Sequence, residues 1–347
     1  MPAPPPLTIS VSPAGADRCA KGRASAEVGR ACARRAPRLR PSTMRVFITG
    51  ATGFIGSWVS YRLLAAGHDL VALARAPSKL PALWQEPRVR CVEGRLTDFD
   101  VIAQAMKGCD ACVHIALGWG ETATSMLALD TRPTAFLVET AAALGLKRFI
   151  YTSSTAALGP FFDAMNETHP LRPDTLYGAT KAACEAYVLA VSSRSSLSCN
   201  VIRPGYTFGN PVVPGASPQS DRRFRTIAEG AVRGESIELS AGDGTQFIWA
   251  GDLARLYVAL LESERDREIY FALSEPFTSW ERIAQYAIER CNSRSRILLA
   301  GDGGPPALFE LGKIREHFGL RFDPQHELRA HVDYWLSVVG RAAASSR

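Results

Sequence analysis

The sequence predicts an α/β protein built around a doubly wound parallel sheet. The first observation is an alternation of short apolar runs with segments of helical length between Arg45 and Arg203. This spacing is typical of strand–helix–strand units, whose sheets are parallel and buried on both faces. The second observation is a glycine-rich turn that follows the first apolar run directly. The predicted strands are Arg45–Ile48, Asp69–Ala74, Val89–Val92, Val113–Ala116, Phe149–Ser154 and Cys199–Arg203.

The glycine-rich turn spans Thr49–Gly56 and reads TGATGFIG. It leads into a helix in which Ile55, Val59 and Leu63 recur at helical spacing. In a strand–turn–helix unit, such glycines permit a tight turn and let backbone N–H groups approach a diphosphate. The helix N-terminus adds free N–H donors and the positive end of its dipole. The turn therefore predicts a dinucleotide site formed by Gly50, Thr52, Gly53, Phe54, Ile55 and Gly56.

The residues after the second predicted strand bear on the choice of dinucleotide. In doubly wound folds an acidic residue at this place binds the 2′-hydroxyl of NAD. This chain has Arg75 there, with Lys79 four residues on. A guanidinium pairs well with the 2′-phosphate of NADP, although a solvated basic loop is the alternative. The sequence favours NADP as the cofactor and leaves NAD open.

A tyrosine and a lysine four residues apart open a predicted helix at Tyr177–Ala190. That spacing places Tyr177 and Lys181 on one helix face. An ammonium beside a phenol favours the phenolate form, so the pair suits general acid–base catalysis. Ser154, at the carboxyl end of the fifth predicted strand, can hold a substrate oxygen against the phenol. These residues predict hydride transfer between a nicotinamide and a carbonyl or carbinol, with Ser154, Tyr177 and Lys181 as the catalytic set.

The remaining segments predict two regions. Residues 44–205 form a Rossmann-type dinucleotide-binding domain, to which residues 246–262 return as a strand end and helix. Residues 206–245 and 263–347 form a smaller, mostly helical C-terminal substrate lobe. Residues 160–176 are rich in proline and predict an irregular loop over the active site. The other predicted helices are Thr131–Leu144, Ser279–Cys291, Ala307–Phe318 and Glu327–Val339.

Residues 1–43 differ in composition from the rest of the chain. They hold eight Lys and Arg residues and two acidic ones, without apolar periodicity, and predict a disordered tail or a start codon assigned too early. Their Arg-rich, acid-poor composition is also typical of an organellar transit peptide, which stays the alternative. Without them, the formal charge of +6 falls to zero. A neutral body gives no reason to expect nucleic acid as a partner. The sequence leaves open whether the protein forms a homodimer.

Cysteine usage and hydropathy predict a cytoplasmic protein. No run approaches the 18 apolar residues of a membrane span. The eight cysteines are scattered, which implies no disulfide framework and fits a reducing compartment. Cys109 and Cys112 form a C-x-x-C without a second pair or a nearby histidine, so we interpret them as a chance match rather than a metal or redox site.

Taken together, residues 44 to about 340 resemble the extended short-chain dehydrogenase/reductases, the NAD(P)-dependent epimerase/dehydratase family. The resemblance rests on the order and spacing of the motifs. These are the TGATGFIG turn, the strand ends at His114–Ala116 and Tyr151–Ser154, the Tyr177-x-x-x-Lys181 pair, Arg203-Pro204-Gly205 and the helix start at Asp252-Leu253-Ala254.

The resemblance implies a role for several residues. Ser154, Tyr177 and Lys181 would be the catalytic trio, and Lys181 would also hold the nicotinamide ribose. The other residues that the resemblance implies along the cofactor channel are Leu96, His114, Ala116, Ser153, Tyr177 and Pro204.

Three departures from the family pattern point to the substrate. Arg95 stands where an acidic residue near the adenine is usual, and Tyr206 stands where nucleotide-sugar enzymes often have asparagine. The stretch Gly242–Gln246 is not followed by the arginine that clamps a sugar diphosphate. We therefore expect a small, partly apolar substrate that contacts Trp119, Phe161, Phe162, Tyr206 or Trp249.

Two other functions stay open at this point. One is a nucleotide-sugar epimerase or dehydratase with tightly held NAD. The other is a dinucleotide sensor without catalysis, against which the complete Ser154, Tyr177 and Lys181 set argues.

Overall fold

The structure is a computed structural model that describes residues 43–77, 85–162, 164–210, 212, 219 and 221–345. The chain divides into two units, Met1–Arg40 and Pro41–Arg347, and every described residue belongs to the second, which is compact. The predicted tail 1–43 lies outside the described residues except for Thr43, and so does Lys79.

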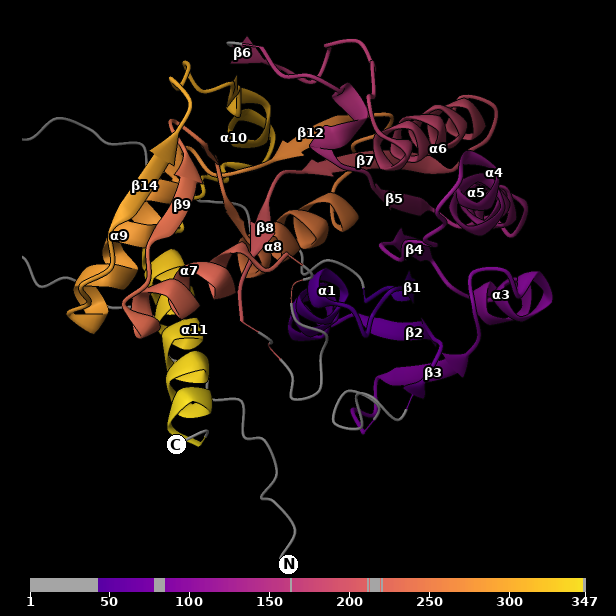
Figure 1. Cartoon of the computed structure of the whole chain (residues 1–347). Helices are drawn as coiled ribbons and strands as arrows, with labels where there is room; N and C mark the ends of the chain where they lie inside the picture. Colours follow the sequence, from indigo (N-terminus) through magenta and orange to yellow (C-terminus); the bar gives the residue numbers. More distant parts are fainter. Residues whose placement is uncertain are drawn as a thin grey trace, which may run out of the picture. The chain divides into compact units, whose positions relative to one another are not determined.

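A seven-stranded parallel sheet lies at the centre of the second unit (Figure 1). The strand order is β12-β7-β5-β4-β1-β2-β3, so the chain builds outward from β1 to β3 and then returns to build the other half from β4. All six pairings are parallel, which confirms the predicted doubly wound sheet. The strands are β1 (Arg45–Thr49), β2 (Asp69–Ala74), β3 (Val89–Glu93), β4 (Ala111–His114), β5 (Arg148–Thr152), β7 (Ser198–Pro204) and β12 (Ile269–Ala272).

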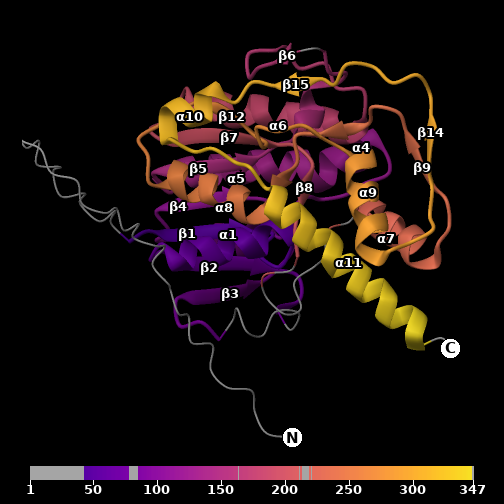
Figure 2. The ribbon, with the colours of Figure 1, turned by 90° about the vertical axis from the view of Figure 1, so that its left-hand side faces the viewer.

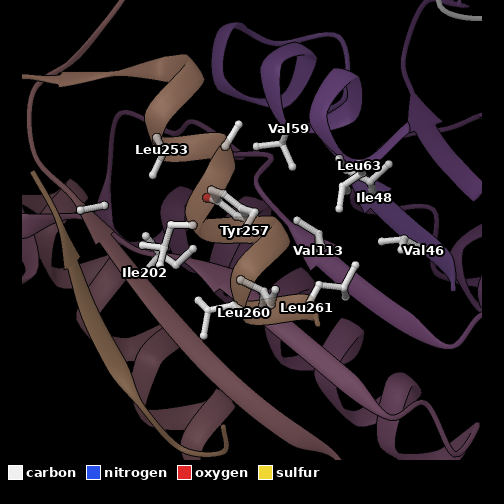
Figure 3. Close-up of a cluster of buried hydrophobic side chains, with 14 of the residues drawn as sticks. Val46, Ile48, Val59, Leu63, Val113, Ile202, Leu253, Tyr257, Leu260 and Leu261 are labelled. Carbon is white, nitrogen blue, oxygen red and sulfur yellow. The ribbon is translucent and has the colours of Figure 1, made fainter. Parts of the chain in front are cut away.

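Helices cover both faces of the sheet and enclose a separate apolar core on each. Helices α1 (Phe54–Ala65) and α8 (Ala250–Leu261) pack against each other on one face, where Val59, Leu63 and Tyr257 meet side chains of the strands (Figure 3). On the other face lie α3 (Phe99–Met106), α5 (Arg132–Ala143) and α6 (Leu176–Ser192). Burial on both faces explains why the strands read as continuous apolar runs.

The seventh strand comes from a segment that the sequence predicts as part of the substrate lobe, residues 263–347. Strand β12 pairs with β7 at the edge of the main sheet. Helix α10 (Gly312–Phe318) also returns to this sheet, since Ile314 is buried in the same core as α1 and α8. A four-residue apolar run gives too short a pattern to identify as a strand before its partner is known.

Three helices form most of the smaller lobe, which we define as α7 (Arg223–Arg233), α9 (Trp280–Cys291) and α11 (Gln325–Ser345) with strands β9 (Ile237–Ser240) and β14 (Ile297–Ala300). The three helices pack side by side in Figure 2, and their shared core holds Phe224, Phe247 and Trp280. The apolar stripe predicted for the last helix is buried here, as the exposures of Leu328, Val332 and Val339 show.

Short elements connect these parts. Strand β6 (Ala164–Met165) lies within the predicted loop 160–176 and pairs with β15 (Leu308–Phe309), so only the second part of the predicted helix Ala307–Phe318 is helical. The other short elements are α4 (Ala123–Met126), the π-helical turn η2 (Leu127–Thr131), the 3-10 turn η3 (Thr155–Leu158), and the strands β8 (Thr207–Phe208), β10 (Gly244–Thr245), β11 (Ile248–Trp249) and β13 (Thr278–Ser279).

The described residues also bear on the cysteine pair and on membrane-spanning segments. Cys109 and Cys112 are both buried and free, and no group of metal-ligating side chains occurs within the described ranges. Among the helices of the described residues, none is long and apolar enough to cross a membrane.

Candidate active site

The predicted site residues gather at the carboxyl edge of the sheet, around the point where strand order reverses. Strands β1 and β4 are neighbours there, and β1 ends at Thr49 while β4 ends at His114. The chain leaves β5 at Thr152 and reaches Ser153 and Ser154 directly afterwards. This crevice is where ligands bind in open α/β sheets.

The glycine turn is shaped so that side chains would not fit. Gly50 has a φ of +77°, and a Cβ on it would lie 2.8 Å from the Ala116 amide nitrogen. A Cβ on Gly56 would lie 1.9 Å from the Gly50 carbonyl oxygen. Helix α1 begins at Phe54 with Gly53 as its N-cap and has no side chain capping its first turn. Its first N–H groups are therefore free for an anion, which fits the diphosphate of the predicted dinucleotide.

Replacing Gly56 by alanine should weaken dinucleotide binding and lower stability. The backbone of the turn must move because the new methyl group overlaps the Gly50 carbonyl oxygen. Overpacking of this kind costs about 1–3 kcal/mol. Urea unfolding and titration with the reduced dinucleotide, followed by its fluorescence, measure the two effects. Gly340→Ala in α11 is the matched control, since its Cβ meets no atom within 4 Å. Equal responses of the two variants would contradict this account of the turn.

His114 is part of a buried hydrogen-bond chain beneath this edge. Thr134 Oγ1 donates to the Asp130 carbonyl oxygen at 2.8 Å, so at its 2.9 Å contact with His114 Nε2 it accepts. His114 Nδ1 then accepts from Thr49 Oγ1 at 2.7 Å. Burial, with the Lys181 charge acting in the same direction, lowers the pKa of His114 to about 3, which agrees with this neutral form.

The same chain fixes the backbone after β4. Thr49 Oγ1 accepts hydrogen bonds from the amides of Ile115 and Ala116, each at 3.2 Å. The imidazole of His114 has no ring nitrogen left for a ligand, so its side chain does not line the predicted channel. Ala116, by contrast, lies against Gly50 at the glycine turn. The sequence did not indicate that His114 acts from below the strand end, because both nitrogens find partners far away in the chain.

Tyr177 and Lys181 occupy the face of α6 that meets the strand ends. Thr175 caps this helix by accepting from the Gly178 amide at 3.0 Å, which places Tyr177 in the first turn. Lys181 is 3% exposed, and its Nζ lies 5.8 Å from the centroid of the Tyr177 ring. Nζ donates to the Thr152 carbonyl oxygen at 3.1 Å. An ammonium has three N–H donors, and within the described ranges this is the one hydrogen bond of Nζ, so two donors are left for a bound group.

Ser154 opens the η3 turn next to these residues. Its Oγ accepts from the Ala156 amide at 3.2 Å, which leaves the hydroxyl proton free to be donated. The side chain is half-buried and follows β5 by two residues. The structure thus brings Ser154 and Lys181 to the end of β5. Lys181 donates to the carbonyl oxygen of Thr152, the last residue of the strand, and Ser154 follows two residues later.

Ser153 points into the protein rather than toward the edge. Its hydroxyl donates to Glu185, which also accepts from Arg203 Nε at 2.9 Å and from Arg203 Nη2 at 2.7 Å. Glu185 and Arg203 are 1% and 2% exposed. This buried ion pair joins β5, α6 and β7 behind the site, so Ser153 does not line the predicted channel with its side chain. The sequence shows that Arg203 precedes Pro204, but it does not indicate that Glu185 is the partner of Arg203.

The remaining predicted residues lie around this centre. Arg75 is exposed after β2 and has no ion-pair partner among the described residues, whereas Leu96 is half-buried against the core under α3. Pro204 ends β7 at the same edge. Of the five aromatic residues predicted near the substrate, Trp119 is the one that meets the trio, with ring centroids 6.5 Å from Tyr177.

The other four aromatic residues have different surroundings in the described part of the chain. Phe161 packs edge-on against Phe309, and Phe162 lines a separate surface pocket with Met165. Tyr206 belongs to the core of the smaller lobe, and Trp249 packs on Trp58 of α1.

Comparisons with known proteins identify the family to which this chain belongs. The profile of the "NAD dependent epimerase/dehydratase family" matches residues 46–272, more than half of the chain. The "3 beta-hydroxysteroid dehydrogenase/Delta 5-->4-isomerase" of Mycobacterium tuberculosis (strain ATCC 25618 / H37Rv) is 32% identical over 318 residues, which are 85% of this chain and 83% of that protein. A dTDP-4-dehydro-6-deoxy-D-allose reductase of Streptomyces bikiniensis is 29% identical over 81% of this chain and 91% of its own.

Solved structures agree on the fold. UDP-glucuronic acid 4-epimerase from Bacillus cereus, in complex with UDP-glucuronic acid and NAD, superposes with a TM-score of 0.73 at 19% identity, covering 85% of this chain and all of that one. The family match and the relatives together confirm the expected type of enzyme. The chain belongs to the NAD dependent epimerase/dehydratase family and is an NAD(P)-dependent oxidoreductase.

Proposed function

We propose that the protein is an NADP(H)-dependent reductase or dehydrogenase of a small, partly apolar carbonyl or carbinol compound. The glycine turn and the free N–H groups of α1 would hold the diphosphate, and the two unpaired N–H donors of Lys181 would hold the nicotinamide ribose. When bound, the nicotinamide supplies or accepts the hydride.

The observation that carries the proposal is the buried Lys181 ammonium beneath the Tyr177 ring, bonded to the Thr152 carbonyl oxygen two residues before Ser154. In the reducing direction, Ser154 donates a hydrogen bond to the substrate oxygen and orients it. Tyr177 Oη then gives its proton to that oxygen. In the oxidising direction, the phenolate takes the proton of the carbinol. The Lys181 ammonium lies beside the phenol in both directions, 5.8 Å from the centroid of its ring.

An apolar substrate is supported by Trp119. Its side chain is 58% exposed and lies beside the Tyr177 ring, so an apolar surface next to a bound carbonyl would cover it. The relative of 32% identity carries the name of a hydroxysteroid dehydrogenase, which is also consistent with an apolar alcohol. Two structural neighbours were solved with UDP-glucuronic acid and NAD, so a nucleotide-sugar epimerase or dehydratase is the alternative function.

Arg75 is the proposed contact for the 2′-phosphate of NADP. Arg75→Ala should weaken NADP about tenfold to a hundredfold, because a charge-assisted hydrogen bond contributes roughly 1.5–3 kcal/mol. The affinity for NAD should hardly change. Calorimetric titration with both dinucleotides measures the difference. Arg194→Ala is the control, because this exposed arginine precedes β7 and so lies at the opposite edge of the sheet. Equal losses for NADP and NAD in Arg75→Ala would refute the assignment.

A screen of carbonyl compounds and alcohols tests the function itself. Purified protein is mixed with NADPH or NADP and a panel of ketosteroids, aromatic ketones, aldehydes and the matching alcohols, and absorbance at the nicotinamide band is followed. We expect turnover with apolar compounds that Trp119→Ala reduces. Turnover only with sugar nucleotides, or protein purified with bound NAD, would favour the epimerase or dehydratase instead. Tight dinucleotide binding without turnover on any panel would favour the sensor.

A further inference from the structure

Asp130 is a buried carboxylate close to the proposed catalytic residues that the sequence analysis did not single out. The residue is 0% exposed and sits in the π-helical turn η2. Its Oδ1 accepts from the Gly118 amide at 2.8 Å. Its Oδ2 is buried and has no hydrogen-bond partner among the described residues. A buried carboxylate with one unsatisfied oxygen is costly, and it needs a compensating charge or role.

The turn η2 has two contacts that matter for the site. It packs against α6, the helix that carries Tyr177 and Lys181. It also supports the Gly118–Gly120 loop, because a Cβ on Gly118 would lie 1.9 Å from the Leu129 carbonyl oxygen. Trp119 lies in that loop and faces Tyr177. Asp130 therefore joins the loop of Trp119 to the helix of the proposed catalytic residues. Single π-helical turns of this kind occur frequently at functional sites.

The titratable groups around Asp130 come from three elements. Lys181 and Cys184 lie on α6, Tyr151 lies on β5, and His114 lies on β4. His114 is neutral by its hydrogen bonds, and burial raises the pKa of both Cys184 and Tyr151. Burial raises the pKa of the Asp130 carboxyl too, while Lys181 acts in the opposite direction. Lys181 is thus the cation whose charge acts on the Asp130 carboxylate among the described residues, and it lies on the helix that η2 packs against.

We propose that Asp130 is a positioning residue that acts through Lys181: its carboxylate balances the buried ammonium beneath Tyr177 and holds the Trp119 loop through the Gly118 amide. The inference rests on the proposed function for its effect on catalysis. The charge balance itself is a property of the folded protein and can be measured without a substrate.

The charge balance predicts opposite effects for two substitutions. Asp130→Asn keeps the shape and an oxygen for the Gly118 amide, but it leaves the site with one more positive charge. The Tyr177 phenol should then ionise at lower pH than in the unchanged protein. Lys181→Met leaves one negative charge and should move the ionisation to higher pH. The double variant removes both charges and should return the midpoint close to that of the unchanged protein.

The experiment follows phenolate absorbance against pH in the protein without substrate or dinucleotide. The difference between the unchanged protein and Tyr177→Phe isolates one tyrosine from the nine in the chain. Each Asp130 and Lys181 variant is measured in both backgrounds, and circular dichroism verifies folding. Glu139→Gln is the matched control, because this exposed residue of α5 makes the same charge change away from the site. Its midpoint should not move.

The outcomes separate this inference from the proposed function. A shift to lower pH in Asp130→Asn, reversed in the double variant, supports the charge balance. No shift in Asp130→Asn while Lys181→Met moves the midpoint overturns the role of Asp130 and leaves the proposed function intact. If Asp130→Asn does not fold, Lys181→Met is compared with the double variant of Lys181→Met and Asp130→Ser. The charge balance then predicts that the double variant reverses the shift of Lys181→Met. Once a substrate is known, the pH profile of turnover should move with the phenolate midpoint.

Discussion

Replacing Tyr177 by phenylalanine is expected to lower turnover by about 10²–10⁴-fold, which is the usual contribution of general acid–base catalysis. The substitution removes one oxygen and keeps the ring that lies over Lys181 and beside Trp119. Folding and dinucleotide affinity should therefore hardly change. Steady-state kinetics on a substrate from the screen, together with dinucleotide titration, measure both quantities.

A second tyrosine on the same helix provides the control. Tyr187 is 53% exposed on α6, and Tyr187→Phe should leave turnover unchanged. Lys181→Met should lower turnover and also weaken the dinucleotide, because two of its N–H donors are free for a bound ribose. Near-normal turnover in Tyr177→Phe would show that the spacing of Tyr177 and Lys181 has no catalytic meaning here.

Breaking the buried Glu185–Arg203 pair on one side should destabilise the region behind the site. Glu185→Gln leaves the Arg203 guanidinium without a compensating charge at 2% exposure. Breaking one partner of a buried ion pair costs about 3–5 kcal/mol. The free energy of unfolding in urea should fall by that amount, because the glutamine keeps one oxygen for Ser153 and Arg203 Nε but turns an NH2 donor toward Arg203 Nη2.

Two comparisons show whether the cost comes from the unpaired charge. The double variant Glu185→Met with Arg203→Met should recover much of the stability, since apolar residues of similar size can replace a buried pair. Glu229→Gln breaks an exposed pair with Arg225 on α7 and should cost less than about 1 kcal/mol. A Glu185→Gln variant as stable as Glu229→Gln would mean that the buried pair contributes nothing.

Much of the fold follows from local patterns in the sequence. The strands are buried on both faces, so their apolar runs are continuous and easy to recognise, and the glycine turn follows the first of them at a fixed place. The doubly wound sheet and the family are confirmed on this basis. Strand β12 and strand β6 were missed, because runs of four and two residues carry no periodicity of their own.

Local sequence patterns also predict one part of the candidate site and not the other. The residue types and spacing of Tyr177 and Lys181, and the position of Ser154 after a strand, could be read from the chain because one helix and one strand end carry them. Their roles stay predictions until the variants are measured. The sequence could not reveal that His114 and Ser153 turn inward, because their partners Thr134 and Glu185 lie 20 and 32 residues away.

By itself, the sequence determined the class of fold, the dinucleotide turn and the kind of chemistry, since each depends on residues close together in the chain. Tertiary structure alone decided which polar groups are buried together. It packed the turn of Asp130 against the helix of Lys181 and placed Glu185 against Arg203, and it brought Trp119 to Tyr177 while leaving Tyr206 in the smaller lobe. Such contacts depend on packing between elements, and a buried charge acquires its partner only when distant segments meet.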